Sequence, residues 1–198
     1  MSLLHLGRFL LTALAMMGSP GPATISLMTS GAAHGPRRSL GYLAGIVAGT
    51  WLVLIGVATG ITVTLLAMPE LRLLLIAASA GYILWLAYRL ATAPPVSAQP
   101  ARAPSLGGGL LLAIANPKAW VAIAATFASA RLLVGTAQDA VVKVGVLAGM
   151  LVPIMTAWLF AGSTLAPLLR SPRAGRAIHV VLAGALVAAA ALALLPGG

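Results

Sequence analysis

The sequence predicts an all-α membrane protein with six transmembrane helices, arranged as two inverted three-helix repeats whose first and fourth helices are broken at prolines. Three observations lead to this fold class. Hydrophobic residues make up 61% of the 198 residues and charged residues only 7%, whereas charged residues make up about 25% of an average soluble domain. The few charges are separated by long apolar stretches. Similar proline and glycine motifs also recur in the two halves of the chain.

The gaps between charged residues predict where the helices lie. A transmembrane helix needs about 20 largely apolar residues, and the apolar stretches place helices at 6–28, 39–66, 71–89, 107–130, 144–166 and 174–195. A cleaved signal peptide is the alternative for the first stretch, but apolar residues resume at 23–28, which favours a broken helix. The proline-rich segment 92–105 is predicted to link two halves, 1–91 and 106–198, of a single transmembrane domain over 1–198.

The distribution of lysine and arginine between the loops predicts the orientation, because cytoplasmic loops carry an excess of both. With the N-terminus outside, the outer loops hold four basic residues: Arg8, Arg72, Arg131 and Lys143. The inner loops then hold seven: Arg37, Arg38, Arg89, Arg102, Arg170, Arg173 and Arg176. Both acids, Glu70 and Asp139, fall in the outer loops. The bias predicts that both termini lie outside.

A break of similar composition interrupts the first helix of each half. Ser19-Pro20-Gly21-Pro22 lies in the first predicted helix, and Asn116-Pro117-Lys118 lies in the fourth. Because each half has an odd number of helices, the second half crosses the membrane in the opposite sense, which makes an inverted repeat. Transporters are commonly built in this way.

The two breaks predict a transport site. Proline has no N–H and clashes with the carbonyl four residues before it, so the breaks leave main-chain carbonyls unpaired. A membrane tolerates such carbonyls only where other helices or a water-filled cavity supply partners. The predicted site residues are Pro20, Gly21, Pro22, Asn116, Pro117 and Lys118. Ordinary proline kinks are the alternative.

Lys118 is the most informative side chain of this predicted site. It lies well inside the fourth predicted helix, where a charged group is costly and needs a partner. Both acids are assigned to outer loops, so two partners remain: the carbonyls freed near Pro20, or the carboxylate of a substrate. Asn116 offers a donor and an acceptor beside it and leaves the same two roles open.

Glycines recur at four-residue spacing in the helix that follows each break. Gly41, Gly45 and Gly49 lie in the second predicted helix, and Gly145 and Gly149 in the fifth. Small residues at this spacing allow helix backbones to approach closely. We expect these glycines to form packing faces, either within the subunit or in a homo-oligomer.

The remaining polar side chains predict no further site. Threonines inside the spans, such as Thr24 and Thr50, are expected to make helix–helix contacts or to bond their own helix. The histidines His5, His34 and His179 lie at the ends of predicted helices, where we expect them at the membrane interface. Three scattered histidines, two acids and no cysteine provide no metal site, catalytic triad or cofactor site, so an enzyme is not expected.

The formal net charge of +10 does not predict a nucleic-acid partner, because the basic residues alternate with long apolar runs instead of sharing one face. The partners expected are the lipid bilayer and a small-molecule substrate.

Four motifs occur in order along nearly the whole chain: Ser19-Pro20-Gly21-Pro22, Gly35-Pro36-Arg37-Arg38-Ser39-Leu40-Gly41, Gly81-Tyr82-Ile83-Leu84-Trp85-Leu86-Ala87-Tyr88-Arg89 and Asn116-Pro117-Lys118-Ala119. With them, the chain resembles the LysE/RhtB family of small bacterial amino-acid exporters. Trp51 and the segment after Phe127 depart from the family pattern, which leaves the identity of the substrate open.

The resemblance implies a secondary transporter that exports amino acids or related small solutes across the bacterial plasma (inner) membrane, by exchange for protons. Two alternatives remain. The chain could export a different class of solute such as a metal cation, although it has no cysteine and no predicted acid within the membrane. It could also be a membrane scaffold that transports nothing, in which case the breaks are only kinks.

Overall fold

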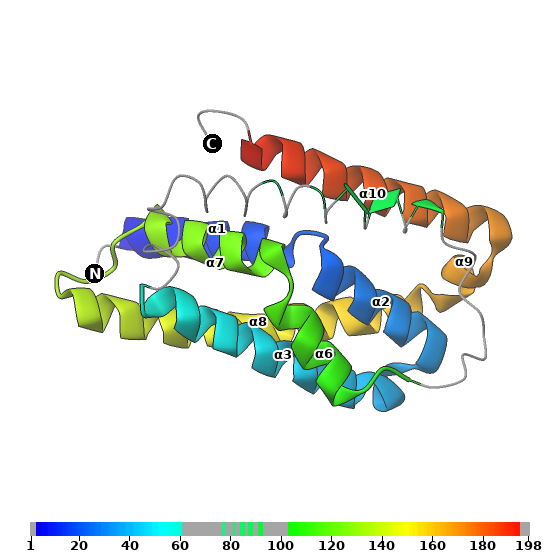
Figure 1. The fold of residues 1–198 in the computed structure, drawn as a ribbon, viewed down its shortest axis with the longest axis horizontal. Helices are drawn as coiled ribbons and strands as arrows, with labels where there is room; N and C mark the ends of the chain where they lie inside the picture. Colours follow the sequence, from blue (N-terminus) through cyan, green and yellow to red (C-terminus); the bar gives the residue numbers. More distant parts are fainter. Residues whose placement is uncertain are drawn as a thin grey trace.

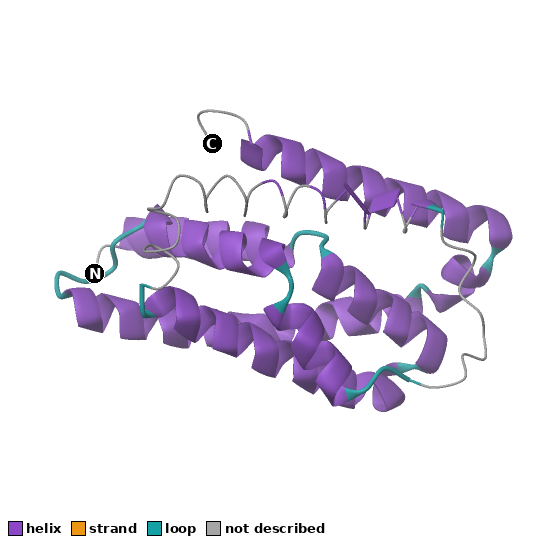
Figure 2. Ribbon diagram, in the orientation of Figure 1, coloured by secondary structure: helices purple, strands orange, loops and turns teal. Residues whose placement is uncertain are grey.

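The computed structural model describes residues 3–60 and 103–194, and between them only residues 77, 81, 84, 85, 87, 88, 91 and 92. In this part of the chain all regular structure is helical, and the helices are joined by short loops (Figure 2). The helices are α1 (Leu3–Gly18), α2 (Pro22–His34), α3 (Pro36–Ala58), α6 (Leu106–Ile114), α7 (Pro117–Ser129), α8 (Thr136–Thr164), α9 (Ala166–Arg170) and α10 (Pro172–Leu194).

Both predicted breaks are present. The pairs α1–α2 and α6–α7 each bend by 58° at a short interruption. By length and composition α3 and α8 can each cross a membrane, with a mean hydropathy of 2.0, and each bent pair can serve as one further span. The helix α10 coincides with the sixth predicted span. The third predicted span and most of the predicted linker lie outside the described residues, so six spans in an inverted repeat stay a prediction.

Prolines determine where several helices begin. Pro22, Pro36, Pro117 and Pro172 are the first residues of α2, α3, α7 and α10. Proline suits this position because its fixed φ is already helical and the N–H that it lacks would have no partner inside the helix. The prediction that the first and fourth helices are broken at prolines is confirmed, and Pro22 and Pro117 each begin the helix that follows the break.

Different helices lie at the two ends of the bundle (Figure 1). At the left-hand end α1 and α8 begin and α3 and α7 end. At the right-hand end lie α2, α6 and the short α9. The helix α10 lies along the outside, on the side away from α3 and α6. Each broken pair therefore contributes one helix to each end, and the breaks lie between the two ends.

Glycines bring two helix pairs into backbone contact. A Cβ on Gly45 or Gly109 would overlap a carbonyl oxygen of the facing helix in the α3–α6 pair. A Cβ on Gly31 or Gly162 would do the same in the α2–α8 pair. In each pair both helices supply a glycine, so the two backbones approach as closely as small residues allow.

The core is continuous between these pairs. Its fully buried side chains include Phe9, Leu27, Ile46, Ile123 and Leu147, contributed by five different helices. The outer faces of the bundle carry exposed large apolar side chains: Leu52, Ile55, Val152, Phe160 and Val181. Apolar residues on both the inner and outer faces are typical of a helix bundle surrounded by lipid.

Candidate functional site

The first break, residues 19–21, exposes backbone carbonyls that other helices bind. Trp158 on α8 donates its indole N–H to Gly18 O at 3.1 Å. Lys118 at the start of α7 donates from Nζ to Ser19 O at 2.6 Å and to Pro20 O at 3.0 Å. Three consecutive carbonyls thus receive hydrogen bonds from side chains distant in sequence, as backbone that is not helical within a membrane requires.

The entry into α2 is capped within the break itself. Gly21, the N-cap residue, has an extended backbone. Its N–H donates to Thr24 Oγ1 at 2.8 Å, and that hydroxyl donates to Gly21 O at 3.1 Å. The helix therefore starts with its first donor satisfied without help from a neighbouring helix.

The second break, at residues 115–116, is bound by its own residues. Asn116 is the N-cap of α7, and its Oδ1 accepts from Lys118 N at 3.2 Å. Trp120 donates its indole N–H to Ile114 O at 2.9 Å, across the break. This leaves the ammonium of Lys118 available to bind the first break.

A cavity lies between the two breaks. Its polar lining comes from Thr24, Thr50, Asn116 and Lys118, on α2, α3, α7 and the break before α7. Its apolar lining includes Met16, Met17, Ile123, Leu151 and Met155. The space open to the centre of a water molecule is about 40 Å³, and one water needs about 10–15 Å³ on that measure. In this conformation the cavity has room for only a few waters.

The polar lining favours an anionic ligand. An ammonium has three donors, and two of those on Lys118 bind carbonyls. Asn116, 4% exposed, uses its oxygen as a cap, so its amide N–H groups remain for a ligand. Thr50 donates its hydroxyl to Ile46 O. Among the described lining residues there is no carboxylate, so the cavity has one positive charge and spare donors.

Gly21 allows the lysine to reach its carbonyls. A Cβ at this position would lie 2.7 Å from Cδ and 2.8 Å from Nζ of Lys118. Both distances are shorter than van der Waals contact, so any side chain at Gly21 would displace the ammonium. Glycine is needed here for close approach.

The predicted site residues all lie at the two breaks. Gly21, Asn116 and Lys118 line the cavity, while Pro20, Pro22 and Pro117 form the breaks and the helix starts. The bracing role considered for Lys118 is observed, and substrate binding stays a proposal. Among the described residues no group of three His, Cys, Asp or Glu side chains could hold a metal ion.

The predicted packing glycines divide into two groups. Gly45 and Gly49 contact α6, because a Cβ on either would overlap its atoms. Gly41, Gly145 and Gly149 have no described atom within 4 Å of where a Cβ would lie. For these three a packing role, within the subunit or in an oligomer, stays a prediction.

Several residues that line the cavity are not among the predicted site residues. Thr24 and Thr50 were expected only to contact helices or to bond their own helix. The spacing of Thr24 three residues after Gly21 matches a helix-capping pattern and could have linked it to the break. Met16, Leu151 and Met155 carry no such signal, because their position follows from how the helices pack.

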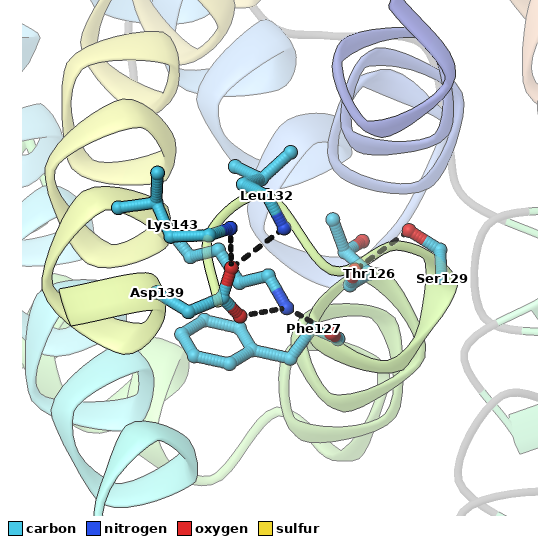
Figure 3. Close-up of polar contacts among 7 residues, drawn as sticks. Thr126, Phe127, Ser129, Leu132, Asp139 and Lys143 are labelled. Atoms are coloured by element: carbon cyan, nitrogen blue, oxygen red, sulfur yellow. Dashed lines mark hydrogen bonds and ion pairs between the residues drawn. The ribbon is translucent and has the colours of Figure 1, made fainter. Parts of the chain in front are cut away.

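A second buried polar cluster lies near the start of α8, at the left-hand end of the bundle in Figure 1, and Figure 3 shows its contacts. Lys143 Nζ lies 2.7 Å from Asp139 Oδ2, and the side chains are 6% and 11% exposed. Asp139 Oδ1 accepts from Leu132 N at 2.6 Å and Leu133 N at 2.8 Å. Lys143 Nζ also donates to Phe127 O at 2.8 Å.

This cluster corrects the assignment of Asp139 and Lys143 to an outer loop. The helix α8 begins at Thr136 instead of 144, so it includes both residues. The prediction assumed that charges mark the ends of helices. Opposite charges four residues apart on one helical face can instead pair and be buried together.

His179 is also placed differently from its prediction. It was expected at the membrane interface, yet it lies within α10 and is 1% exposed. The sequence predicts a helix in this part of the chain, but it does not predict that the side of the helix with His179 packs against the bundle.

Comparisons with known proteins identify the family. The model of the LysE type translocators matches residues 14–198. The cysteine/O-acetylserine efflux protein of Salmonella choleraesuis (strain SC-B67) is 40% identical over 77 residues, which cover 38% of this chain and 39% of that protein. The protein of the same name from Escherichia coli (strain K12) is 39% identical over 77 residues, with the same coverage. The chain thus aligns with about two fifths of the length of these curated relatives.

No solved structure matches the chain. The family model nevertheless covers nearly all of it, including both breaks, the cavity lining and α8. The chain belongs to the family of LysE type translocators.

Proposed function

We propose that this protein exports amino acids, or small solutes like them, and binds their carboxylate with Lys118 and Asn116 between the two broken helices. Membership of the translocator family and the names of its relatives as cysteine/O-acetylserine efflux proteins support a transport role. The observation that carries the proposal is Lys118, a lysine in the cavity lining with one donor left for a ligand.

Binding of a carboxylate would loosen the contact between the breaks. Ser19 O and Pro20 O carry only partial negative charge, whereas a carboxylate carries a full charge opposite to that of the ammonium and attracts it more strongly. A substrate carboxylate therefore competes with both carbonyls for Lys118. The cavity has room for only a few waters, so it must widen to admit a solute. We infer an alternating-access cycle in which the ammonium moves from the carbonyls to the substrate.

The lining favours solutes with an uncharged side chain. A basic side chain would need a carboxylate, and none is present among the described lining residues. Met16, Met17 and Met155 provide flexible, polarizable surface that adapts to different shapes. Cysteine and O-acetylserine, which the relatives are named for, both have uncharged side chains.

Export of a metal cation fits this cavity less well. A cation would have to enter beside the positive charge of Lys118 without an acidic ligand from the described lining. A scaffold without transport activity is the remaining alternative. It predicts that solute crosses vesicles containing the protein no faster than empty vesicles.

The test is solute exchange in proteoliposomes loaded with O-acetylserine. Lys118→Glu should abolish exchange, because it places a negative charge where the carboxylate binds, and Lys118→Ala should reduce it at least about tenfold. Arg131→Ala, which removes an exposed cation outside the cavity, is the matched control and should exchange normally. Correct insertion is checked by size-exclusion chromatography in detergent. Normal exchange by Lys118→Ala would refute direct binding.

We also propose that the protein crosses the inner membrane six times as an inverted repeat, with both termini outside, and that it exchanges the solute for protons. The chain has no cysteine, so single cysteines can report the orientation. Gln138→Cys and Thr164→Cys lie on exposed positions near opposite ends of α8. An impermeant maleimide should label Gln138→Cys in intact cells and Thr164→Cys only after permeabilisation. The reverse labelling pattern would show that the termini lie inside.

A further inference from the structure

We propose that Asp139 and Lys143 form a second solute site, which binds the zwitterionic part of an α-amino acid on its way out and closes the path when no solute is present. The inference rests on the proposed function. The α-ammonium of the solute would pair with Asp139 and the α-carboxylate with Lys143, replacing the ion pair between the two side chains.

Asp139 and Lys143 each make further hydrogen bonds besides the ion pair. A solute could therefore replace the ion pair while those other bonds remain. Asp139 Oδ1 is held by two backbone N–H groups, and Oδ2 by Lys143 alone among the described residues. Lys143 keeps a second bond, to Phe127 O. If the ion pair opens, the remaining bonds still hold both groups in place. The carboxylate of Asp139 can then bind the ammonium of a zwitterion, and the ammonium of Lys143 can bind its carboxylate.

The aromatic ring of Phe127 provides further support for a cation. Its centroid lies 5.6 Å from Lys143 Nζ. A ring at that distance attracts a cation through its negative face. The same ring face can therefore stabilise the ammonium of a solute that takes the place of the lysine beside Asp139.

The pair and the cavity lie on the same stripe of α8. Asp139, Lys143, Leu147, Leu151 and Met155 follow one another at four-residue spacing, and all are buried. Residues four apart are neighbours on a helix surface, so these side chains form a continuous row along α8. Leu151 and Met155 line the cavity, and at 1.5 Å per residue Leu151 lies about 12 Å along the helix from Lys143. Leu147 is the one layer of this stripe between the pair and the cavity.

The pair lies at the end of the bundle where α1 and α8 begin (Figure 1). The basic residues of the sequence predict that the N-terminus is outside, which makes this end the exit for an exported solute. The helix α7 joins the two sites, with Lys118 near its start and Phe127 near its end. A solute leaving Lys118 would thus move along α7 and α8 toward the pair.

Stability alone does not account for the buried ion pair. Replacing such a pair by well-packed apolar residues is often neutral or stabilising, because desolvation offsets the attraction. An apolar closure, however, would force a zwitterion to give up its hydration without compensation. An ion pair that exchanges partners with the solute keeps every charge paired in both states.

Few other charges face this site. The described parts of α7 and α3 provide no charged side chain at this end of the bundle, and Arg131 in the connection between α7 and α8 is exposed. His5 and Arg8 on α1 are exposed as well. The pair is therefore the buried element of recognition at this end in the described part of the chain.

The experiment compares two isomeric solutes in exchange assays with proteoliposomes: O-acetylserine, a zwitterion, and N-acetylserine, which has no ammonium. In Asp139→Asn, exchange of O-acetylserine should fall about tenfold, and exchange of N-acetylserine, which has no ammonium to pair with Asp139, should not fall. Binding of O-acetylserine at equilibrium should be nearly unaffected, because the Lys118 cavity is intact. Gln138→Ala, a neighbouring exposed position, is the control. An equal loss for both solutes, or no loss, would overturn the proposal.

A double variant keeps the test decisive if Asp139→Asn does not fold. Asp139→Leu with Lys143→Met removes both charges and retains apolar volume, so we expect it to fold and to bind O-acetylserine. Its exchange of O-acetylserine should fall about tenfold or more, and exchange at the wild-type rate would refute the site. Wild-type protein that neither binds nor exchanges O-acetylserine would instead contradict the proposed function.

Discussion

The two breaks have the same bend but opposite roles in hydrogen bonding. Both bend by 58° and both are followed by a helix that begins at a proline. The first break presents carbonyls that Trp158 and Lys118 bind from other helices. The second is bound by its own Asn116 and Trp120. The first break thus depends on the rest of the bundle, whereas the second supports itself and provides the lysine.

This difference shows how two similar interruptions can form one site. The second break binds its own carbonyl with Trp120, so Lys118 is free to donate elsewhere. The first break leaves its carbonyls unbound by its own residues, and these carbonyls are the acceptors for Lys118. The contact between them therefore runs in one direction, from the donor of the second break to the carbonyls of the first. Removing a donor that binds the first break should accordingly lower the stability of the protein more than removing one that binds the second.

The largest effect on stability is expected for Lys118→Met. It leaves Ser19 O and Pro20 O without the donor that holds them, and an unsatisfied buried polar group costs about 1–3 kcal/mol. The apparent Tm in detergent should drop clearly, measured by intrinsic fluorescence. An unchanged Tm would show that water in the cavity replaces the ammonium fully.

A smaller effect on stability, with a clear effect on activity, is expected for Gly21→Ala. The added Cβ meets only the flexible end of Lys118, so the ammonium can shift and keep part of its bonding to Ser19 O and Pro20 O, and the Tm should fall less than for Lys118→Met. The displaced ammonium should reduce O-acetylserine exchange about tenfold, which corresponds to about 1.4 kcal/mol. Gly41→Ala is the matched control, since a Cβ there meets no described atom. Normal exchange by Gly21→Ala would contradict the need for close approach.

Asn116→Ala tests whether the second break is supported by its own cap. Loss of an N-cap side chain typically costs about 1 kcal/mol, and the cavity loses an amide donor with it. We expect a small fall in Tm and a rise in the KM for O-acetylserine. A change in Tm with an unchanged KM would limit Asn116 to the capping role.

The smallest effects are expected from paired tryptophan substitutions. Trp158→Phe and Trp120→Phe each keep the ring but remove the indole N–H that binds a break carbonyl. A net hydrogen bond contributes about 0.5–1.5 kcal/mol. We expect the larger loss of thermal stability for Trp158→Phe, because its bond joins α8 to the first break. Equal losses would remove the distinction between a dependent and a self-supporting break.

Much of the site could be predicted from local patterns. Proline, glycine and a lysine inside an apolar stretch act through the backbone near them, so the breaks and the position of Lys118 follow from the sequence. The burial of Asp139 and Lys143 could not be predicted in this way, because it depends on Leu132, Leu133 and Phe127 being brought to them. The lining by Leu151 and Met155 and the burial of His179 likewise depend on helix packing.

The glycine contacts also determine which parts of the bundle can move. In the α2–α8 pair Gly31 faces Leu159 O and Gly162 faces Met28 O; in the α3–α6 pair Gly45 faces Leu106 O and Gly109 faces Tyr42 O. Two backbone contacts oppose both sliding and rotation within a pair, so we expect each pair to move as a unit. The helices α1 and α7 have no such reciprocal contact among the described residues. We therefore expect α1 and α7 to change position relative to the two pairs during transport, and α7 would carry Lys118 with it.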